Sequence, residues 1–196
     1  MERLQRAAVM LSLIDKLHGV GSWSGETHVQ KATYVLQELL GVPLGYDFAL
    51  YKHGPYSFSL SDDITALRAD AVLRLEPKPY PYGPSIVADQ ESKQIAQRYP
   101  KTMARYDPVT DFVARRLGPM RVAELERIAT ALYVTREQDM SHDVESRAQR
   151  IHQLKPHVTL EQAREAVTQV DAFIVEARDI EMQDVREPEP QVAGRA

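Results

Sequence analysis

The chain has 196 residues, a hydrophobic fraction of 43%, a net charge of −4 and no cysteine. This length and composition suit one domain with a buried core and exclude wholesale disorder. The lack of cysteine excludes disulfides, thiol nucleophiles and thiolate metal sites, and it agrees with the reducing cytoplasm, where we expect the protein to reside. The negative charge argues against general binding to polyanions.

Residues 1–18 predict an amphipathic helix that opens the fold. Their apolar side chains recur at helical spacing, at Leu4, Ala8, Leu11, Ile14 and Leu17. Charged residues interrupt the run and no small-residue cleavage site follows, so a signal peptide is not expected. The longest apolar runs fall far short of the roughly 20 residues that span a bilayer, and we expect no membrane association.

A second helix is predicted after a glycine- and serine-rich loop at residues 19–25. Thr27 and Gln30 have the spacing of a capping box, and Gly41 offers a left-handed stop. The apolar stripe of this helix predicts a core face, which consists of Val29, Ala32, Leu36, Leu39 and Leu40.

A short strand is predicted at residues 48–53, where aromatic and aliphatic side chains nearly alternate. Gly54-Pro55 is expected to end it, because proline lacks the N–H that a central ladder uses. Ser59, with Asp62 three residues later, has the spacing of an N-terminal cap, so a third helix is expected to begin there.

Residues 71–77 and 85–89 predict two more strands, joined by a segment too rich in proline for regular structure. A helix followed by a two-stranded ribbon is the outline of a winged-helix unit. The second half of the chain predicts helices at 90–99 with Asp89 as cap, from Asp107-Pro108 to Gly118-Pro119, at 120–134, at 142–154, and from a capping box of Thr159 and Gln162 onward.

These elements predict a mainly α fold with a small antiparallel β element (α+β), a winged-helix-like helical domain. We expect a single domain at residues 1–181, with its short β-ribbon near 48–89. Residues 182–196 combine proline and charge without periodicity, which predicts a disordered acidic tail.

The sequence contains no recognisable catalytic, metal or cofactor motif. Its six histidines are scattered without paired metal-ligand spacing, and it has neither a Gly-x-Ser-x-Gly elbow nor a Walker phosphate loop. We therefore predict no catalytic residue, no metal site and no cofactor. An enzyme of unrecognised type that uses His53 with Asp62 or Asp63 stays open as an alternative.

The stretch YKHGPYSFSLSDD, residues 51–63, has two interpretations. In one, Tyr51 and Tyr56 pack against the second helix and the Gly-Pro pair only turns the chain. In the other, these tyrosines join Lys52 and His53 in contacting a partner. Tyrosine and histidine combine apolar area with a hydrogen-bonding tip, and both suit contact surfaces.

A winged-helix DNA-binding regulator is a further hypothesis. Residues 93–127 contain eight basic and four acidic residues, an excess of four positive charges in a chain that is negative as a whole. Phosphate contacts would supply most of the affinity. The candidate nucleic-acid contacts are Arg98, Lys101, Arg105, Arg115 and Arg116.

The sequence also resembles a known family. HVQKATYVLQELLGVPLGYDFALYKHGPYSFSLSDDITALRADAVL, with ELERIATALYVTRE and RIHQLKPHVTLEQAREAV, looks like the YwgA-type family of uncharacterised bacterial proteins. More distantly, residues 31–34 followed by YKHGP are similar to the signature of Panacea domains, the SocA-like antitoxins. The resemblance spans roughly residues 27–75 and 120–170.

The resemblance implies a mainly helical domain with a small β element and no established catalytic residue. Panacea domains are thought to neutralise a toxin protein by binding it. We therefore expect a non-enzymatic interaction domain with a protein partner, either a toxin or a defence component. The candidate partner-binding residues are Lys31, Tyr34, Tyr51, Lys52, His53, Gly54, Pro55, Tyr56, Ser57 and Asp62.

Overall fold

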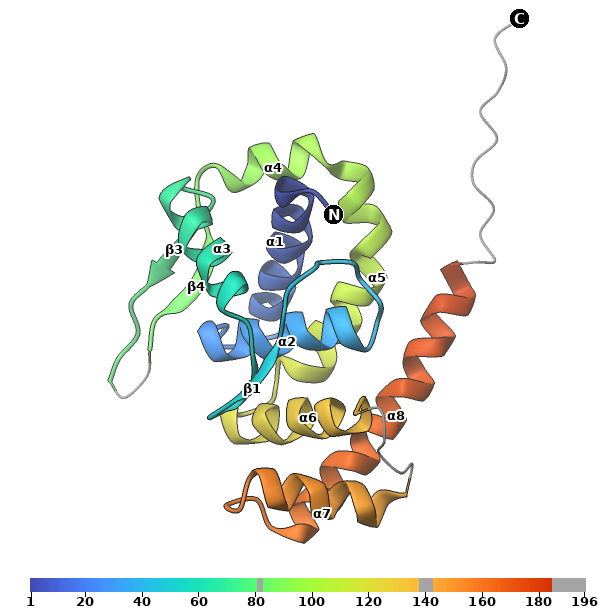
Figure 1. Cartoon of the computed structure of the whole chain (residues 1–196). Coiled ribbons are helices and arrows are strands. Elements are labelled where there is room, and N and C mark those ends of the chain that lie inside the picture. The colour runs from blue at the N-terminus through green and yellow to red at the C-terminus, as the bar shows by residue number, and fades with distance from the viewer. Residues whose placement is uncertain (81–82, 138–142, 185–196) are drawn as a thin grey trace, which may run out of the picture.

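The computed structural model describes residues 1–80, 83–137 and 143–184, with side chains described up to residue 180. Within these ranges the fold is mainly helical and carries two small antiparallel sheets (Figure 1). The predicted fold class, mainly α with a small antiparallel β element, is confirmed.

The described helices are α1 (Arg3–Gly19), α2 (Glu26–Glu38), α3 (Phe58–Ala69), α4 (Ser92–Arg98), α5 (Pro100–Leu117), α6 (Val122–Thr135), α7 (Val144–Leu154) and α8 (Leu160–Asp184). The strands are β1 (Ala49–Tyr51), β2 (Gly54–Tyr56), β3 (Leu73–Glu76) and β4 (Ser85–Ala88). Strand β1 pairs with β2, and β3 pairs with β4.

Helix α2 lies in the middle of the fold and is buried on every side. Its residues 28–36 are all buried, whether apolar or polar. The helix packs against α1, α5, α6 and β2, and Figure 1 shows it between α1 above and α6 below. A polar side chain on this helix therefore has to find its partners inside the protein, because an unpaired polar group in the interior is costly.

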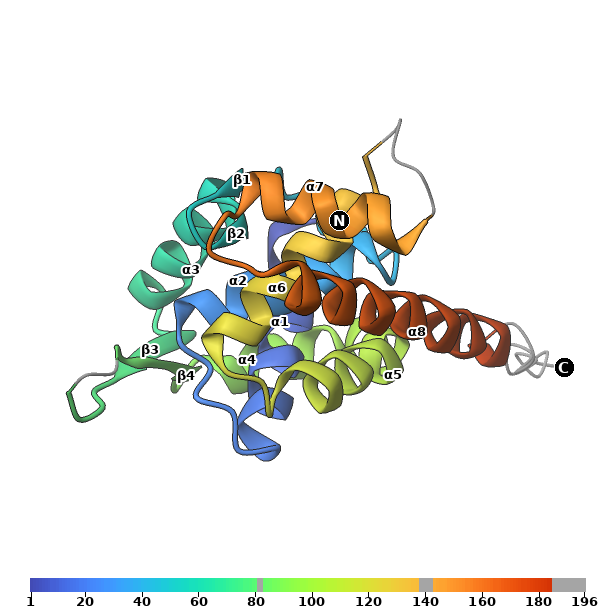
Figure 2. The same cartoon turned by 90° about the horizontal axis from the view of Figure 1, so that it is seen from below.

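The remaining helices pack around this centre. Helix α1 packs along α5, while α6, α7 and α8 pack against one another. In Figure 1, α6 and α7 lie below α2, and α8 runs upward on the right; Figure 2 shows the same helices from below. Phe112 of α5 meets Phe173 of α8 edge-on, with 6.0 Å between ring centroids. The ribbon β3–β4 follows α3, which packs against β3. Among the described residues, every helix is too short or too polar to traverse a lipid bilayer.

Several local predictions are confirmed. Strands β3 and β4 pair antiparallel, with Leu73 opposite Ala88. Gly41 adopts a left-handed conformation, with φ +64°. Thr159 and Gln162 form the expected capping box, since the backbone N–H of each donates to the side-chain oxygen of the other at 3.2 Å.

The predicted starts of α2 and α3 are wrong. Helix α2 begins at Glu26 with Gly25 as N-cap, so Thr27 lies inside the helix. Helix α3 begins at Phe58, and its N-cap is Ser57, whose Oγ accepts from the Leu60 backbone N–H. Both predictions placed the cap two residues too late, because several Ser, Thr and Gly residues near each start can serve as a cap.

The predicted starts of the next two helices are also wrong. The N-cap of α4 is Glu91 rather than Asp89. Helix α5 begins at Pro100, so Pro108 lies inside it and Asp107 is no cap. Proline in a helix interior removes one hydrogen bond. Beyond this point α5 still contacts α1, where the hydroxyls of Thr110 and Ser12 lie 3.2 Å apart.

Two predicted boundaries, the start of α7 and the end of α8, lie partly outside the described residues. Helix α8 continues through Asp184, so residues 182–184 of the predicted disordered tail are helical, and residues 185–196 lie outside the described part. Helix α7 begins at Val144, and position 142, where it was predicted to begin, also lies outside that part. Differences of one or two residues at helix ends are ordinary.

Candidate functional site

The YKHGPY sequence forms a β-hairpin. Ala49 pairs with Tyr56 and Tyr51 pairs with Gly54, so Lys52 and His53 form the turn. The expectation that Gly54-Pro55 turns the chain is therefore wrong, because both residues belong to β2. Gly54 adopts φ +87° just after the turn, a backbone conformation that glycine tolerates best.

Three aromatic rings lie together where this hairpin meets the start of α3. The ring centroids of Tyr51, Tyr56 and Phe58 lie 5.1–6.1 Å apart. The exposed fractions are 61% for Tyr51 and 63% for Phe58, and Tyr56 is half-buried. We call these three residues the aromatic surface. Clustered exposed apolar side chains mark contact sites more often than scattered ones do.

A buried lysine from α2 holds the second strand of the hairpin. Lys31 is only 2% exposed, and its Nζ donates to the Pro55 carbonyl oxygen at 2.8 Å. Burial lowers the pKa of Lys31 from 10.5 to about 8, a shift that the carboxylate of Glu126 opposes and the charge of Lys155 increases. A hydrogen bond from a charged donor is stronger than a neutral one, and it fixes this carbonyl in place.

A second buried lysine holds the first strand and the turn. Lys155 follows α7 and is 6% exposed. Its Nζ donates to the carbonyl oxygens of Tyr51, at 2.6 Å, and Lys52. The two lysines thus bind backbone carbonyls in both strands of the hairpin. The tyrosines of the aromatic surface are attached to this fixed backbone.

The hairpin is also joined to α3. Gln30 of α2 donates to the Ser57 carbonyl oxygen at 2.9 Å and accepts from the Ser57 backbone N–H at 3.0 Å. On the surface, the Glu26 carboxylate accepts from the hydroxyls of Tyr56 and Ser61 at 3.0 and 2.9 Å. These bonds fix the aromatic surface relative to α2 and α3.

A single carboxylate lies beneath the hairpin turn. Glu126 of α6 is 7% exposed, and its Oε1 lies 3.6 Å from Lys155 Nζ and 3.3 Å from His157 Nε2. Its Oε2 lies 3.6 Å from His53 Nδ1. We call Lys31, Lys155, Glu126, His53 and His157 the charged cluster.

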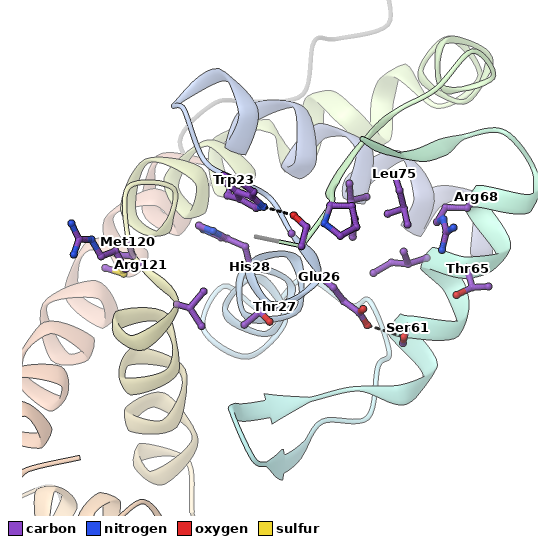
Figure 3. Close-up of a pocket in the computed structure, with 16 residues that line it drawn as sticks. Trp23, Glu26, Thr27, His28, Ser61, Thr65, Arg68, Leu75, Met120 and Arg121 are labelled. Carbon is purple, nitrogen blue, oxygen red and sulfur yellow. Dashed lines mark hydrogen bonds between the residues drawn. The ribbon is translucent and has the colours of Figure 1, made fainter. Parts of the chain in front are cut away.

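Two cavities open beside these residues. A cavity of about 310 Å³ is lined by Lys31, His53 and the three rings of the aromatic surface, together with Glu26, Thr27 and Gly54. A larger one, of about 910 Å³, lies between α2, α3, the β3–β4 ribbon and the start of α6 (Figure 3). Trp23 at its edge donates to the Gly83 carbonyl oxygen at 2.9 Å. The two cavities share Glu26 and Thr27.

The predicted partner-binding residues divide into two groups. Tyr51, Lys52, His53 and Asp62 are exposed and Tyr56 is half-buried. The others are buried beneath this exposed group: Lys31, Tyr34, Gly54, Pro55 and Ser57. They support the exposed group from inside. Tyr34, for example, packs edge-on against Phe48 with ring centroids 5.0 Å apart, and burial raises its pKa.

The proposed catalytic pairing of His53 with Asp62 or Asp63 does not form. His53 lies next to Glu126, whereas Asp63 accepts from Arg6 at 3.0 Å and from the Tyr46 hydroxyl at 2.9 Å. In the part of the chain that the structure describes, His, Asp and Glu side chains form no cluster of three that could bind a metal ion.

The five candidate nucleic-acid contacts lie exposed along α4 and α5. Arg115 forms an ion pair with Asp111 at 2.8 Å, and Arg116 pairs with Glu176. These pairs neutralise part of the patch. Helix α3, which precedes the ribbon as a winged-helix recognition helix would, carries Asp62 and Asp63. None of these observations supports DNA binding.

A comparison of this chain with protein-family models and with curated proteins finds no match.

We predict that Gly54→Ala destabilises the fold. Alanine disfavours φ +87°, at a cost of about 1–2 kcal/mol. A Cβ there would also lie 3.3 Å from Thr130 Oγ1 and 3.4 Å from Lys31 Cε. Urea unfolding measures the loss. Gly83→Ala is the control, since its Cβ meets nothing within 4 Å. Equal stability of the two variants would contradict the prediction.

We also predict a pH dependence that comes from Lys31. Its pKa is about 8 in the folded protein and about 10.5 when unfolded, so the unfolded state binds more protons between these values. The free energy of unfolding from this residue must rise with pH in that window, by up to about 1.4 kcal/mol per pH unit.

Urea unfolding between about pH 8 and 10 measures this slope. Lys31→Met removes the titrating group, and the difference between wild type and variant cancels the other titrations. The variant should show the smaller upward slope. Parallel stability profiles for the two proteins would contradict the lowered pKa.

Proposed function

We propose that this chain is a non-enzymatic interaction domain that binds a protein partner through the aromatic surface. The observation that carries the proposal is a cluster of three rings, two on a hairpin whose backbone carbonyls are bound by two buried lysines and one at the start of α3. Large aromatic side chains supply much of the binding energy of protein interfaces.

The fixed backbone of the hairpin favours a binding role for the exposed rings. A loop that orders only on association loses conformational entropy at that step, and a preorganised one does not. Lys31, Lys155 and Gln30 hold the hairpin before any partner arrives. The backbone beneath the exposed rings of Tyr51 and Phe58 is therefore already ordered, which suits the recognition of a specific surface.

The resemblance to Panacea domains supports a more specific role. In that family, an antitoxin is thought to neutralise a toxin protein by binding it, without catalysing a reaction. We propose the same kind of action for this chain, on a toxin or defence component in the cytoplasm. The three ring residues that carry the surface are part of the segment on which the resemblance depends.

The test is capture of a partner from an extract of the native host, with the full chain as bait. Tyr51→Ala combined with Phe58→Ala should lower capture more than tenfold, because truncation of an anchoring aromatic costs about 2 kcal/mol. Tyr80→Ala is the matched control, since Tyr80 is 97% exposed and lies on the β3–β4 connection. Capture that is equal for all three proteins, or no stoichiometric partner, would overturn the proposal.

A further inference from the structure

Lys31 is a buried cation without a carboxylate partner of its own. Among the described residues it forms no ion pair, and its one hydrogen bond goes to the Pro55 carbonyl oxygen. An ammonium group has three N–H donors. Lysine is rarely buried unless it is paired, because removing a charge from water is costly. Within the described part of the chain, two N–H donors of the Lys31 ammonium therefore have no acceptor, and its charge has no carboxylate in contact.

Glu126, the nearby carboxylate, forms no ion pair with Lys31. Glu126 acts on Lys31 through its charge, but its own close neighbours are Lys155, His53 and His157. The charged cluster contains two lysines and one carboxylate, and that carboxylate lies against Lys155. One further carboxylate would give Lys31 an ion-pair partner.

The 310 Å³ cavity gives a ligand access to Lys31. Lys31 lines the cavity together with the rings of Tyr51, Tyr56 and Phe58. Glu26, at its edge, is engaged by the hydroxyls of Tyr56 and Ser61, and Figure 3 shows its side chain directed toward Ser61. The cavity therefore combines apolar walls with a cation that lacks an ion pair.

We propose that the protein partner inserts a glutamate side chain into this cavity, with its carboxylate on Lys31 and its methylene groups against the three rings. This inference rests on the proposed function and names the partner chemistry that its surface selects. Glutamate fits because its apolar stem can contact the rings while its charged end reaches the lysine. A charge-assisted hydrogen bond in a site shielded from water is among the strong ones.

The lowered pKa of Lys31 gives this contact a pH signature. The amine loses its proton as pH rises through about 8, so preference for a carboxylate should fall above that value. Two charged groups act on this titration, Glu126 from α6 and Lys155 after α7. His53 from the hairpin turn and His157 before α8 lie against Glu126, and Glu26 from α2 lines the same cavity.

The test uses two acetylated and amidated tripeptides, Leu-Glu-Leu and Leu-Gln-Leu, which differ only in the charged group. Each is titrated into the full chain while the ring signals of Tyr51 and Phe58 are followed by NMR. At pH 7 the glutamate peptide should bind at least tenfold more tightly. The preference should diminish by pH 10, and it should disappear in Lys31→Met but persist in Lys31→Arg.

Equal affinity of the two peptides for the wild-type chain would overturn the inference, and this result requires no variant to fold. A glutamate preference that persists in Lys31→Met would also overturn it, since an exposed cation such as Lys52 would then be the contact. Partner capture that depends on Tyr51 and Phe58 without any glutamate preference would leave the proposed function standing. Capture that is independent of both rings would refute that function instead.

Discussion

The site depends on one interaction, the hydrogen bond from the buried Lys31 ammonium to the Pro55 carbonyl oxygen. Pro55 has no N–H, so its carbonyl is the one backbone hydrogen-bonding group that it offers, and Lys31 binds it from α2. Lys155 binds the opposite strand in the same manner. A hairpin whose strands have three residues each is too short to be stable alone, and these two lysines attach it to the helical core.

This arrangement connects the interior of the protein to its surface. Hydrogen bonds to backbone carbonyls stabilise part of the charge inside the protein, and the strands that carry those carbonyls position the rings of Tyr51 and Tyr56 beside Phe58. Of these two lysines, Lys31 has no ion-pair partner among the described residues. Recognition of a partner by apolar contact and by charge would thus occur at one place.

Much of the fold was predictable because local signals were consistent. Helical periodicity predicted α1 and α8, and the Thr159–Gln162 spacing predicted the cap that starts α8. The burial of Lys31 was not predictable from periodicity, because α2 is surrounded on every side and its polar residues resemble a solvent face. Glu126, Lys155, His157 and Phe58 were also missed as site residues. The first three meet the hairpin only through tertiary packing, which no local pattern contains.

Hydrogen exchange of the hairpin amides tests the central claim most directly, that the lysines fix the hairpin backbone. In the wild type, we expect the amides of Tyr51 and Tyr56 to be protected. Loss of a hydrogen bond to a charged group, worth about 1.5–3 kcal/mol, should speed their exchange more than tenfold in Lys31→Met while the amides of α8 change little. Equal protection of the hairpin in the two proteins would contradict the account.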